Sequence, residues 1–390
     1  MSTADFHADA HRDSFRPRRE ITLGDMATKI RVGIVGATVT PGGSGWGAHA
    51  HVPALQVLPD YELTAVCTAH EDTATASAAA FGAKLAFHNF DDMLGHADVD
   101  LVAVVVRVPG HHDLVMRALQ AGKNVFCEWP LGANVAQAEE MSNLAAERSL
   151  RTVVGLQARS DPTLMYAREL VQQGHIGEVL SANLNYVSQA VTQRGNGRIW
   201  QADRRNGANT LTIAAGHAID ALCFVLGEFA EVSARLATKI TEWHNTDTGE
   251  TIKVDSPDWI NVAGRLQHGA EVSFLVTTQP FNPSGNRFEI YGSEGTLVIS
   301  GGSANTGPNH LQGARGKDPL VAMEPPARFV LAPDGTPAGP PRNVAQAYAR
   351  LASAFEAHAP FEPDFAHAVQ RHKLLEALER SSAEGHTVRL

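Results

Sequence analysis

One histidine of this sequence is placed where it could move a proton. His217 lies in the run GHAID at residues 216–220, within a segment of small and apolar residues that predicts a helix over 209–226. The ordinary pKa of imidazole is near neutrality, which suits His217 to general acid–base catalysis. Asp220 falls on the same helical face and can orient the ring, but these two residues without further ligands do not make a metal site, so no metal is expected. The alternative is a histidine hydrogen-bonded inside a packed helix.

A glycine-rich stretch follows a short apolar run at residues 32–35. Gly36, Gly45 and Gly47 stand between this predicted strand and a helix-competent segment. Glycines at such a turn permit positive φ and let a phosphate approach the main chain, and the helix N-terminus adds unpaired N–H groups. The pattern predicts a dinucleotide diphosphate site that includes Trp46. The fit to G-x-G-x-x-A begins nine residues after Gly36, so the loop is longer than usual, and a flexible surface loop is the alternative.

Alternating strand and helix patterns over residues 29–155 predict the domain that positions this turn. Six strands with helical crossovers are expected, among them 32–35, 62–67, 100–106, 124–127 and 152–156, with helices at 71–81, 112–121 and 135–148. Buried apolar strands joined by helices indicate a parallel, doubly wound Rossmann sheet, an α/β fold. Ligands of such sheets bind at the carboxyl ends of the strands.

Residues 156–390 have a different texture and predict an α+β domain for substrate binding and oligomerisation. Strands are expected at 179–187, 230–236, 259–267, 271–277, 288–291 and 295–299. Strands in succession favour a large, mostly antiparallel open sheet. Residues 300–345 are rich in Gly, Pro, Asn and Ala and predict a long loop excursion, followed by a closing helix at 365–382 and an edge strand at 386–390.

Composition limits the classes of protein. A length of 390 residues suggests two domains, and 44% hydrophobic with 19% charged residues indicates a globular chain. The net charge of −10 argues against nucleic-acid binding, and the longest apolar run, 101–106, is too short for a membrane span of about 20 residues. Residues 1–28 lack the apolar core of a signal peptide and are expected to form a disordered leader or arm. Three widely spaced cysteines offer no disulfide framework, so a cytoplasmic location is expected.

The end of the second predicted strand bears on the choice of cofactor. A carboxylate there would bind the 2′-hydroxyl of the adenosine ribose. This chain has Thr68 and His70 instead, and Glu71 follows slightly too late. Thr68 and His70 tolerate a 2′-phosphate, so NADP is slightly favoured over NAD. The alternative is that both are solvated loop residues.

Four sequence runs occur in a familiar order: IRVGIVG, PGHHDLVMRALQAGKNVFCEWPLG, GHAID and NRFEIYGSEGTL. This order resembles the glucose–fructose oxidoreductase/inositol dehydrogenase (Gfo/Idh/MocA) family over residues 29–390. Within it, the chain looks most similar to the branch that contains the fungal galactose-pathway repressor, which binds NAD(P) without known need for turnover. The resemblance implies NADP or NAD as cofactor, a small-molecule substrate, and a homodimer or homotetramer joined through the open face of the second sheet.

Two positions depart from the family pattern. The family usually has Glu-Lys-Pro, with the lysine reaching the nicotinamide and the reacting carbon, where this chain has Trp129. The family's catalytic aspartate, four residues before the histidine, is Ile213 here, so only His217 of the usual set remains. Trp129 is expected to stack beside the nicotinamide or substrate, and packing at a domain hinge is the alternative.

The resemblance and the strand ends together imply two groups of ligand-binding residues. Those expected at the cofactor, beyond the residues named above, are Pro109, His111, Glu128, Trp129 and Pro130. Those expected at the substrate are Arg159, Tyr186, Trp200, Arg204, Asn209 and His217. Two alternatives stay open: His111 is equally suited to cap its helix, and Arg159 either holds a carboxylate or phosphate of the substrate or pairs with a neighbouring acid.

These residues predict an NAD(P)-dependent oxidoreductase. It would transfer a hydride between nicotinamide and a sugar, polyol or related secondary alcohol or carbonyl, with His217 moving the hydroxyl proton. The absent lysine and aspartate favour a different class, a non-catalytic NAD(P)-binding regulatory protein that recognises a partner through its second domain. A lyase or hydrolase that oxidises its substrate transiently is a third reading. The fold's usual role favours the enzyme by analogy.

Overall fold

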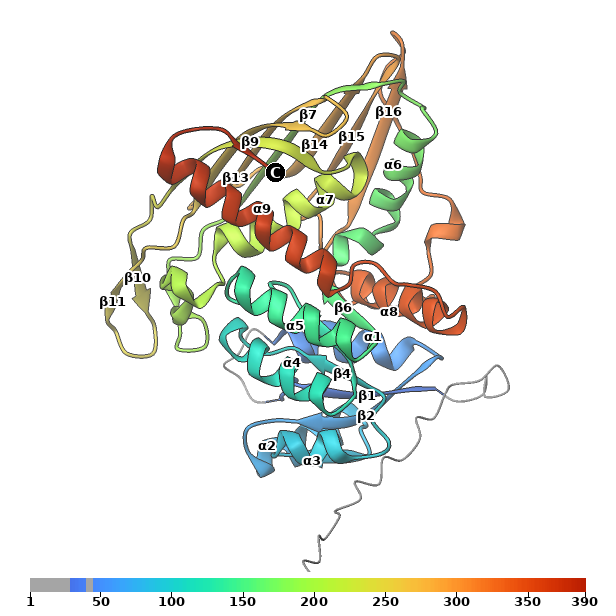
Figure 1. Cartoon of the computed structure of the whole chain (residues 1–390), viewed down its shortest axis with the longest axis vertical. Coiled ribbons are helices and arrows are strands. Elements are labelled where there is room, and N and C mark those ends of the chain that lie inside the picture. The colour runs from blue at the N-terminus through green and yellow to red at the C-terminus, as the bar shows by residue number, and fades with distance from the viewer. Residues whose placement is uncertain (1–28, 40–44) are drawn as a thin grey trace, which may run out of the picture.

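The structure is a computed structural model that describes residues 29–39 and 45–390. The predicted leader at 1–28 and residues 40–44 of the glycine-rich loop lie outside the described residues. Two domains are stacked along the long axis of the molecule, with the first at the bottom in Figure 1.

The first domain is the predicted Rossmann fold. Its strands are β1 (Ile30–Val35), β2 (Tyr61–Cys67), β3 (Leu85–Phe87), β4 (Leu101–Val104), β5 (Asn124–Glu128) and β6 (Thr152–Gly155). All pair in parallel in the order β3-β2-β1-β4-β5-β6. The crossover helices are α2 (Glu71–Phe81), α3 (Phe90–Gly95), α4 (His111–Gln120) and α5 (Val135–Glu147). The strand order reverses between β1 and β4, which is where such sheets bind ligands.

A helix from the far end of the chain completes this domain. The π-helix η1 (Gly47–His51) leads into α1 (Val52–Val57), and α8 (Pro340–Glu356) packs beside them. Tyr348 on α8 is buried, with its ring 4.9 Å from that of Phe126 and 5.1 Å from that of Tyr61. The sequence analysis did not predict α8, and its packing means that residues 29–155 alone do not complete the first core.

The second domain is built on a nine-stranded mixed sheet in the order β17-β16-β15-β14-β7-β13-β12-β9-β18. Its strands are β7 (Val179–Gln189), β9 (Phe229–Ala237), β12 (Trp259–Leu266), β13 (Glu271–Gln279), β14 (Gly285–Gly292), β15 (Gly295–Gly301), β16 (Asn309–Arg315), β17 (Val321–Ala322) and β18 (Val388–Arg389). Only β7 and β13 pair in parallel; the remaining neighbours are antiparallel. The predicted open, mostly antiparallel sheet is confirmed.

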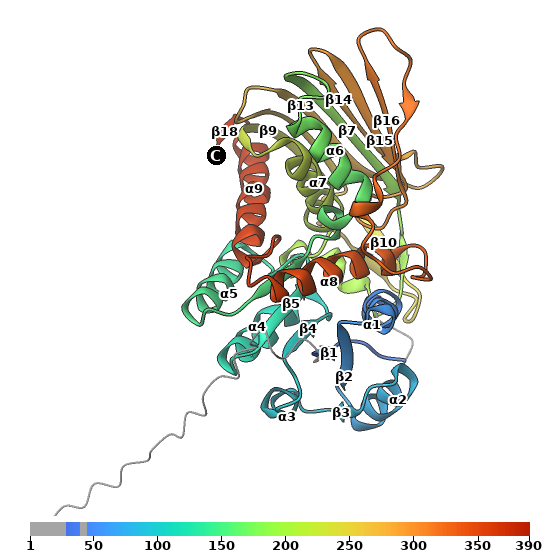
Figure 2. The same ribbon diagram turned by 90° about the vertical axis from the view of Figure 1, so that its right-hand side faces the viewer.

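The strand register gives this sheet one apolar and one polar face. One cross-strand row consists of the buried side chains Val262, Phe274, Leu184, Phe288, Ile299 and Leu311. The adjacent row, one residue along each strand, consists of Asn261, Leu275, Asn185, Arg287, Ser300 and His310. Side chains alternate between faces, so burying the first row exposes the second. Helices α6 (Pro162–Gln172), α7 (Gly216–Leu226) and α9 (Phe365–Glu384) cover the apolar face, while the other face is open (Figures 1 and 2).

The expected loop excursion over 300–345 is wrong in part. This range contains β16, β17, the short helix η7 (Ala327–Phe329) and the start of α8. Asn309, Leu311 and Gly313 are buried in alternation with exposed residues, which is the pattern of a strand despite the high content of glycine and asparagine.

A small sheet lies at the level where the two domains meet. It consists of β8 (Gln193–Arg194), β10 (Glu242–Asn245) and β11 (Thr251–Lys253), accompanied by the short helices η4 (Ile199–Ala202) and η5 (Arg204–Asn206). Figure 1 shows β10 and β11 beside the junction. Within the residues that the structure describes, no helix is both long and apolar enough to cross a membrane.

Candidate functional site

The turn after β1 has the geometry expected of a diphosphate site. Gly36 has a φ of +99°, and a Cβ atom there would lie 2.3 Å from the carbonyl oxygen of Val105, so only glycine fits. Gly47 brings η1 against the strand end, where a Cβ would lie 2.9 Å from Cα of Ala37. Gly45 and Trp46 directly precede η1. At positions 36 and 47 the absence of a Cβ atom therefore lets the strand end and η1 come close together, as the predicted dinucleotide turn requires.

The residues after β2 are arranged as a tight polar turn. The Thr68 hydroxyl donates to the carbonyl oxygen of His70 at 3.0 Å and lies 2.7 Å from the hydroxyl of Thr73. The His70 side chain is exposed and does not cap α2. No carboxylate occupies the turn itself, because Glu71 and Asp72 lie in the first turn of α2.

The loops after β4 and β5 are tied together by His111. Pro109 lies in the short helix η2 (Val108–Gly110), and His111 begins α4. The imidazole of His111 is buried, with Nδ1 2.9 Å from the carbonyl oxygen of Pro130 and Nε2 3.2 Å from that of Val106. Burial lowers the pKa of His111, and the carbonyl oxygens of Val106 and Pro130 offset part of this effect. His111 does not cap its helix. Its ring links the loops after β4 and β5, at the edge of the sheet where the cofactor is expected.

Glu128, at the end of β5, is the centre of a buried polar network. Its carboxylate accepts from Nε2 of Gln157 at 2.8 and 3.0 Å and lies 2.9 Å from Nε2 of His51. The other ring nitrogen of His51 is 2.9 Å from the Tyr348 hydroxyl. Gly155 on β6 makes room for this carboxylate, since a Cβ there would lie 2.5 Å from Oε1. The network joins η1, β5, the short helix η3 (Gln157–Ser160) and α8 at the carboxyl edge of the sheet.

The structure corrects the role expected for Trp129. Its indole Nε1 donates to the carbonyl oxygen of Thr212 at 2.7 Å, and its ring centroid lies 4.7 Å from that of His372. A Cβ on Gly216 would lie 2.6 Å from Nε1, and only 5% of Trp129 is exposed. With its N–H bonded and the ring buried against His372, the indole packs between the domains, which is the alternative expected for Trp129. The Trp129–Pro130 bond is cis.

His217 lies on α7 with an unsatisfied ring nitrogen. The π-helix η6 (Thr210–Ala215), capped by the side chain of Asn209, leads directly into α7. His217 is 7% exposed, and in the part of the chain that the structure describes its Nδ1 has no hydrogen-bond partner. Burial lowers the pKa of His217 to about 4, and the negative charges of Glu128 and Asp220 offset only part of this effect. The imidazole is therefore neutral at pH 7 and able to accept a proton.

Asp220 does not orient His217 but is the centre of a buried ion-pair network. Arg159 donates to its carboxylate from Nε at 2.9 Å and from Nη2 at 2.9 Å, and Arg371 of α9 donates at 3.2 Å. The ring of His367 lies 3.2 Å away. These partners hold the pKa of Asp220 well below its usual range in spite of complete burial. Of the two alternatives for Arg159, the ion pair is the one that the structure contains.

The remaining residues predicted at the substrate are spread over the junction. Tyr186 is partly buried against the core of the second domain. The Trp200 ring lies 6.0 Å below the guanidinium of Arg107, which follows β4. Arg204 turns to the outer side of α9, where Nη2 is 2.6 Å from Glu379. Arg204 is therefore corrected to a surface ion pair.

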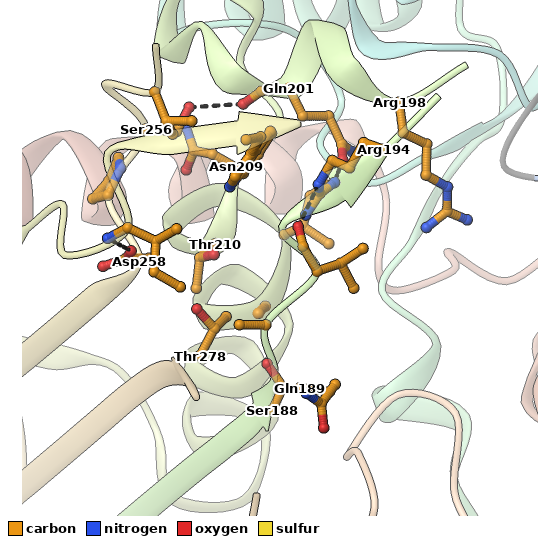
Figure 3. Close-up of a pocket in the computed structure, with 18 residues that line it drawn as sticks. Ser188, Gln189, Arg194, Arg198, Gln201, Asn209, Thr210, Ser256, Asp258 and Thr278 are labelled. Atoms are coloured by element: carbon orange, nitrogen blue, oxygen red, sulfur yellow. Dashed lines mark hydrogen bonds between the residues drawn. The ribbon is translucent and has the colours of Figure 1, made fainter. Parts of the chain in front are cut away.

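Asn209, in contrast, borders a cavity of about 220 Å³. This cavity lies between η6, the ends of β7 and β13, and the small sheet (Figure 3). Ile213, the position of the missing aspartate, also contributes to the wall, and His217 follows one turn later on the same helix. Further wall residues that sequence reasoning missed are Ser188, Arg194, Trp243, Ser256 and Thr278. They come from short strands and strand ends that carry no periodic signal. Among the described residues, no three His, Cys, Asp or Glu side chains gather to hold a metal.

Fold and site define a dinucleotide-binding Rossmann protein with an open-sheet second domain. A model of the oxidoreductase family, NAD-binding Rossmann fold, matches residues 30–156, and a model of the Gal80p C-terminal domain matches residues 162–301. The dehydrogenase aclE of Aspergillus oryzae is 33% identical over 290 residues, which cover 71% of this chain and 78% of aclE. The chain belongs to the Gfo/Idh/MocA family, in its Gal80-like branch, as the four sequence runs predicted.

Both functional classes occur among similar proteins. The galactose/lactose metabolism regulatory protein GAL80 of Saccharomyces cerevisiae is 27% identical over 318 residues, covering 74% of this chain and 70% of GAL80. A levoglucosan dehydrogenase, solved in complex with NADH and L-sorbose, has the same fold, with a TM-score of 0.80 and 21% identity over 93% of this chain and 98% of that structure.

Removing the charge of Asp220 should destabilise the fold. Asp220→Asn leaves Arg159 and Arg371 buried without their shared carboxylate, so the free energy of unfolding should fall by about 3–5 kcal/mol. Urea denaturation followed by circular dichroism measures this. The matched control is Asp113→Asn, which removes an exposed partner of Arg117 and should cost less than about 1 kcal/mol. Equal losses in the two variants would contradict the assignment of the buried network as a stabilising centre.

Proposed function

We propose that this protein is an NAD(P)-dependent oxidoreductase acting on a sugar, polyol or related secondary alcohol or carbonyl. The observation that carries this proposal is the buried Nδ1 of His217, which has no partner in the described chain. Oε1 of Gln157, whose Nε2 bonds Glu128 at the end of β5, is also buried and unpartnered there. Each such atom costs about 1–3 kcal/mol if left unsatisfied, and hydroxyl groups of a bound ligand would satisfy both.

The residues that would hold the cofactor follow the edge of the Rossmann sheet. The bare turn at Gly36 and the N-terminus of η1 would hold the diphosphate, and the braced loops around His111 and Pro130 would border the nicotinamide half. When bound, the oxidised nicotinamide supplies a hydride acceptor. The sites of Gly36, Glu128 and His111 all lie at or beyond carboxyl strand ends, which is where this chemistry occurs in such folds.

His217 carries the proton in this proposal. As the carbinol carbon loses its hydride, the hydroxyl proton passes to the neutral imidazole, and a carbonyl remains. The negative charges of Glu128 and Asp220, which raise the affinity of His217 for a proton, stabilise the imidazolium formed. In the opposite direction, the imidazolium returns the proton to the carbonyl oxygen. A histidine that is neutral at pH 7 favours the oxidation of an alcohol.

A non-catalytic NAD(P)-binding regulator is the second candidate, and a specific observation favours it. Trp129 and Ile213 occupy the positions of the family's lysine and aspartate. The Trp129 side chain is buried in packing contacts between the domains. The similarity of residues 162–301 to the Gal80p C-terminal domain points the same way. In this interpretation, the first domain would hold the cofactor, and the protein would recognise a protein partner through its second domain.

For the cofactor, we propose NADP, with NAD as a slightly less favoured alternative. The exposed His70 and the absence of a carboxylate within the Thr68–His70 turn leave space for a 2′-phosphate. Solved neighbours in complex with NADH support NAD as the alternative.

Assembly and location are proposed from the second sheet and the cysteines. The open face of the nine-stranded sheet would join two or four copies, since no helix of the described chain covers it.

Cys67, Cys127 and Cys223 are free and buried, which supports a reducing cytoplasm. Cell fractionation tests this location, and recovery outside the cytoplasmic fraction would contradict it.

Replacing the proton-transfer group should abolish turnover and spare cofactor binding. His217→Ala should lower kcat about 10²- to 10⁴-fold, measured by nicotinamide absorbance against a panel of sugars, polyols and their ketones. The control is His386→Ala, an exposed histidine that follows α9. If the wild-type protein binds cofactor tightly but turns over no panel member, the regulator is favoured. If His217→Ala keeps full turnover, the proton-transfer role is wrong.

A carboxylate after β2 should shift cofactor choice. His70→Asp places a negative charge where the 2′-phosphate of NADP would lie, so the preference for NAD over NADP should rise at least about 10-fold. Dissociation constants from fluorescence titration measure this without any need for turnover. His386→Asp adds the same charge in the second domain, beyond α9, and should leave the ratio unchanged. An unchanged ratio in His70→Asp would show that His70 does not face the ribose.

Disrupting the open face should separate the subunits. Sedimentation velocity is expected to show a species of two or four times 41.7 kDa for the wild type. Leu275→Asp puts a charge at the centre of the outward row and should shift the population towards monomer. A wild-type monomer at all concentrations would contradict this assembly.

A further inference from the structure

The cavity beside η6 has a charged wall opposite the strand ends. Figure 3 shows Arg194, Gln201 and Ser256 on one side, and Thr278, Ser188 and Gln189 on the other. At about 220 Å³ it would hold roughly seven waters at about 30 Å³ each, which is the room of one small molecule. Its lining is rich in hydroxyl and amide groups, so it suits a hydroxylated ligand.

Arg194 is held rigidly in this wall without a carboxylate. Its guanidinium lies 3.9 Å from the centroid of the Trp243 ring, Nε donates to the carbonyl oxygen of Val191 at 3.0 Å, and Nη1 donates to the side-chain oxygen of Gln201. Among the described residues, no Asp or Glu forms a salt bridge with it, in contrast to Arg159 and Arg371. The stack and the two neutral acceptors fix the orientation of the guanidinium but leave its charge unbalanced.

The charges around Arg194 increase the need for an anion. Burial lowers the pKa of Arg194 to about 10, and the like charge of Arg198 contributes in the same direction. Arg194 nevertheless stays protonated at neutral pH. The carboxylate in the cavity wall, Asp258, accepts the backbone N–H groups of Lys239 and Ile240 at 2.8 and 2.7 Å. Asp258 does not pair with Arg194, and over residues 29–39 and 45–390 the half-buried guanidinium forms no salt bridge with an Asp or Glu.

We propose that this cavity binds the anionic head group, a carboxylate or phosphate, of a small hydroxylated substrate, and that Arg194 is the residue that selects for it. A fixed guanidinium fork matches the paired oxygens of such an anion. This inference rests on the proposed function and narrows its substrate class to sugar acids or sugar phosphates. Ile213 lines the cavity, and His217, which does not line it, follows four residues later where η6 leads into α7, so the proposal requires the hydroxylated part of the molecule to extend from Arg194 along η6 towards α7.

The anion also accounts for the apolar residue at position 213. In the proposed oxidation, His217 would take the O–H proton as the substrate C–H bond breaks, and an oxidised nicotinamide, when bound, would supply the hydride acceptor. The acceptors are thus the bound nicotinamide and His217, and no further co-reactant is needed. A carboxylate at position 213 would repel an anionic substrate in this cavity, whereas Ile213 does not.

The test is a binding measurement that does not depend on turnover. Calorimetric titrations of the protein saturated with NADP or NAD use gluconate, glucuronate, glucose 6-phosphate and the neutral glucose and sorbitol as probes. At least one acid or phosphate should bind about 10-fold or more tightly than its neutral counterpart. Arg194→Gln should weaken that binding roughly 10- to 100-fold and leave the neutral probes unchanged. The acids and the phosphate distinguish the two anionic groups.

Two controls separate recognition from folding. Arg194→Lys keeps the charge but loses the planar fork and the stack on Trp243, so it should retain part of the preference for the anion. Arg205→Gln removes an exposed arginine that pairs with Asp203 and should change nothing. Cofactor affinity and the thermal midpoint confirm that each variant is folded.

The outcomes of these titrations distinguish the anion site from the oxidoreductase activity. No saturable binding of any anionic probe, or an equal loss for neutral and anionic probes in Arg194→Gln, would overturn the inference. If neutral probes alone are oxidised and Arg194→Gln is unaffected, the anion site is wrong while the oxidoreductase stands. If anions bind through Arg194 but none is oxidised, the anion site stands while the oxidoreductase fails.

Discussion

The buried ion pair between Arg159 and Asp220 is the interaction on which the site depends. Arg159 lies in η3, directly after the last Rossmann strand, and Asp220 lies on α7 one turn beyond His217. Arg371 extends the network to α9. Both charges are out of water, so the pair holds only while η3, α7 and α9 keep this relative placement. The position of His217 relative to the edge of the Rossmann sheet follows from that constraint.

Two substitutions relative to the family pattern turned polar positions into packing positions. Trp129 donates its N–H to the main chain of η6 and packs against α9, so it joins the domains where a lysine would face the ligand. Ile213 makes the neighbouring cavity wall apolar. In the proposed oxidoreductase, proton transfer is then left to His217, whose burial lowers its pKa. The same two changes are compatible with a non-catalytic protein that binds its cofactor and is recognised by a protein partner. For this reason we consider both the oxidoreductase and the regulator.

In the second domain, the large sheet gives the site its support, and short segments form much of the cavity wall. Its sheet and the helices that cover it carry the apolar cross-strand row, and they form a platform whose strand ends point to the first domain. The small sheet of β8, β10 and β11 adds the remaining wall of the cavity, with Arg194 stacked on Trp243. Residues that distinguish ligands therefore stand on short irregular segments placed against a rigid scaffold.

Local pattern and periodicity determined the Rossmann domain, the open sheet, the glycine-rich turn after β1 and the nomination of His217. These depend on burial alternation and turn chemistry, which are properties of neighbouring residues. The sequence alone did not determine that α8 returns to complete the first core, that Arg159 serves Asp220, that Trp129 is buried between domains, or that Arg194 faces a cavity. Such roles depend on which distant segments meet, and a charged or aromatic side chain carries no local sign of its partner. Tertiary packing decided them, because burial compels each charge to find a counter-charge and each ring a neighbour wherever the fold brings one.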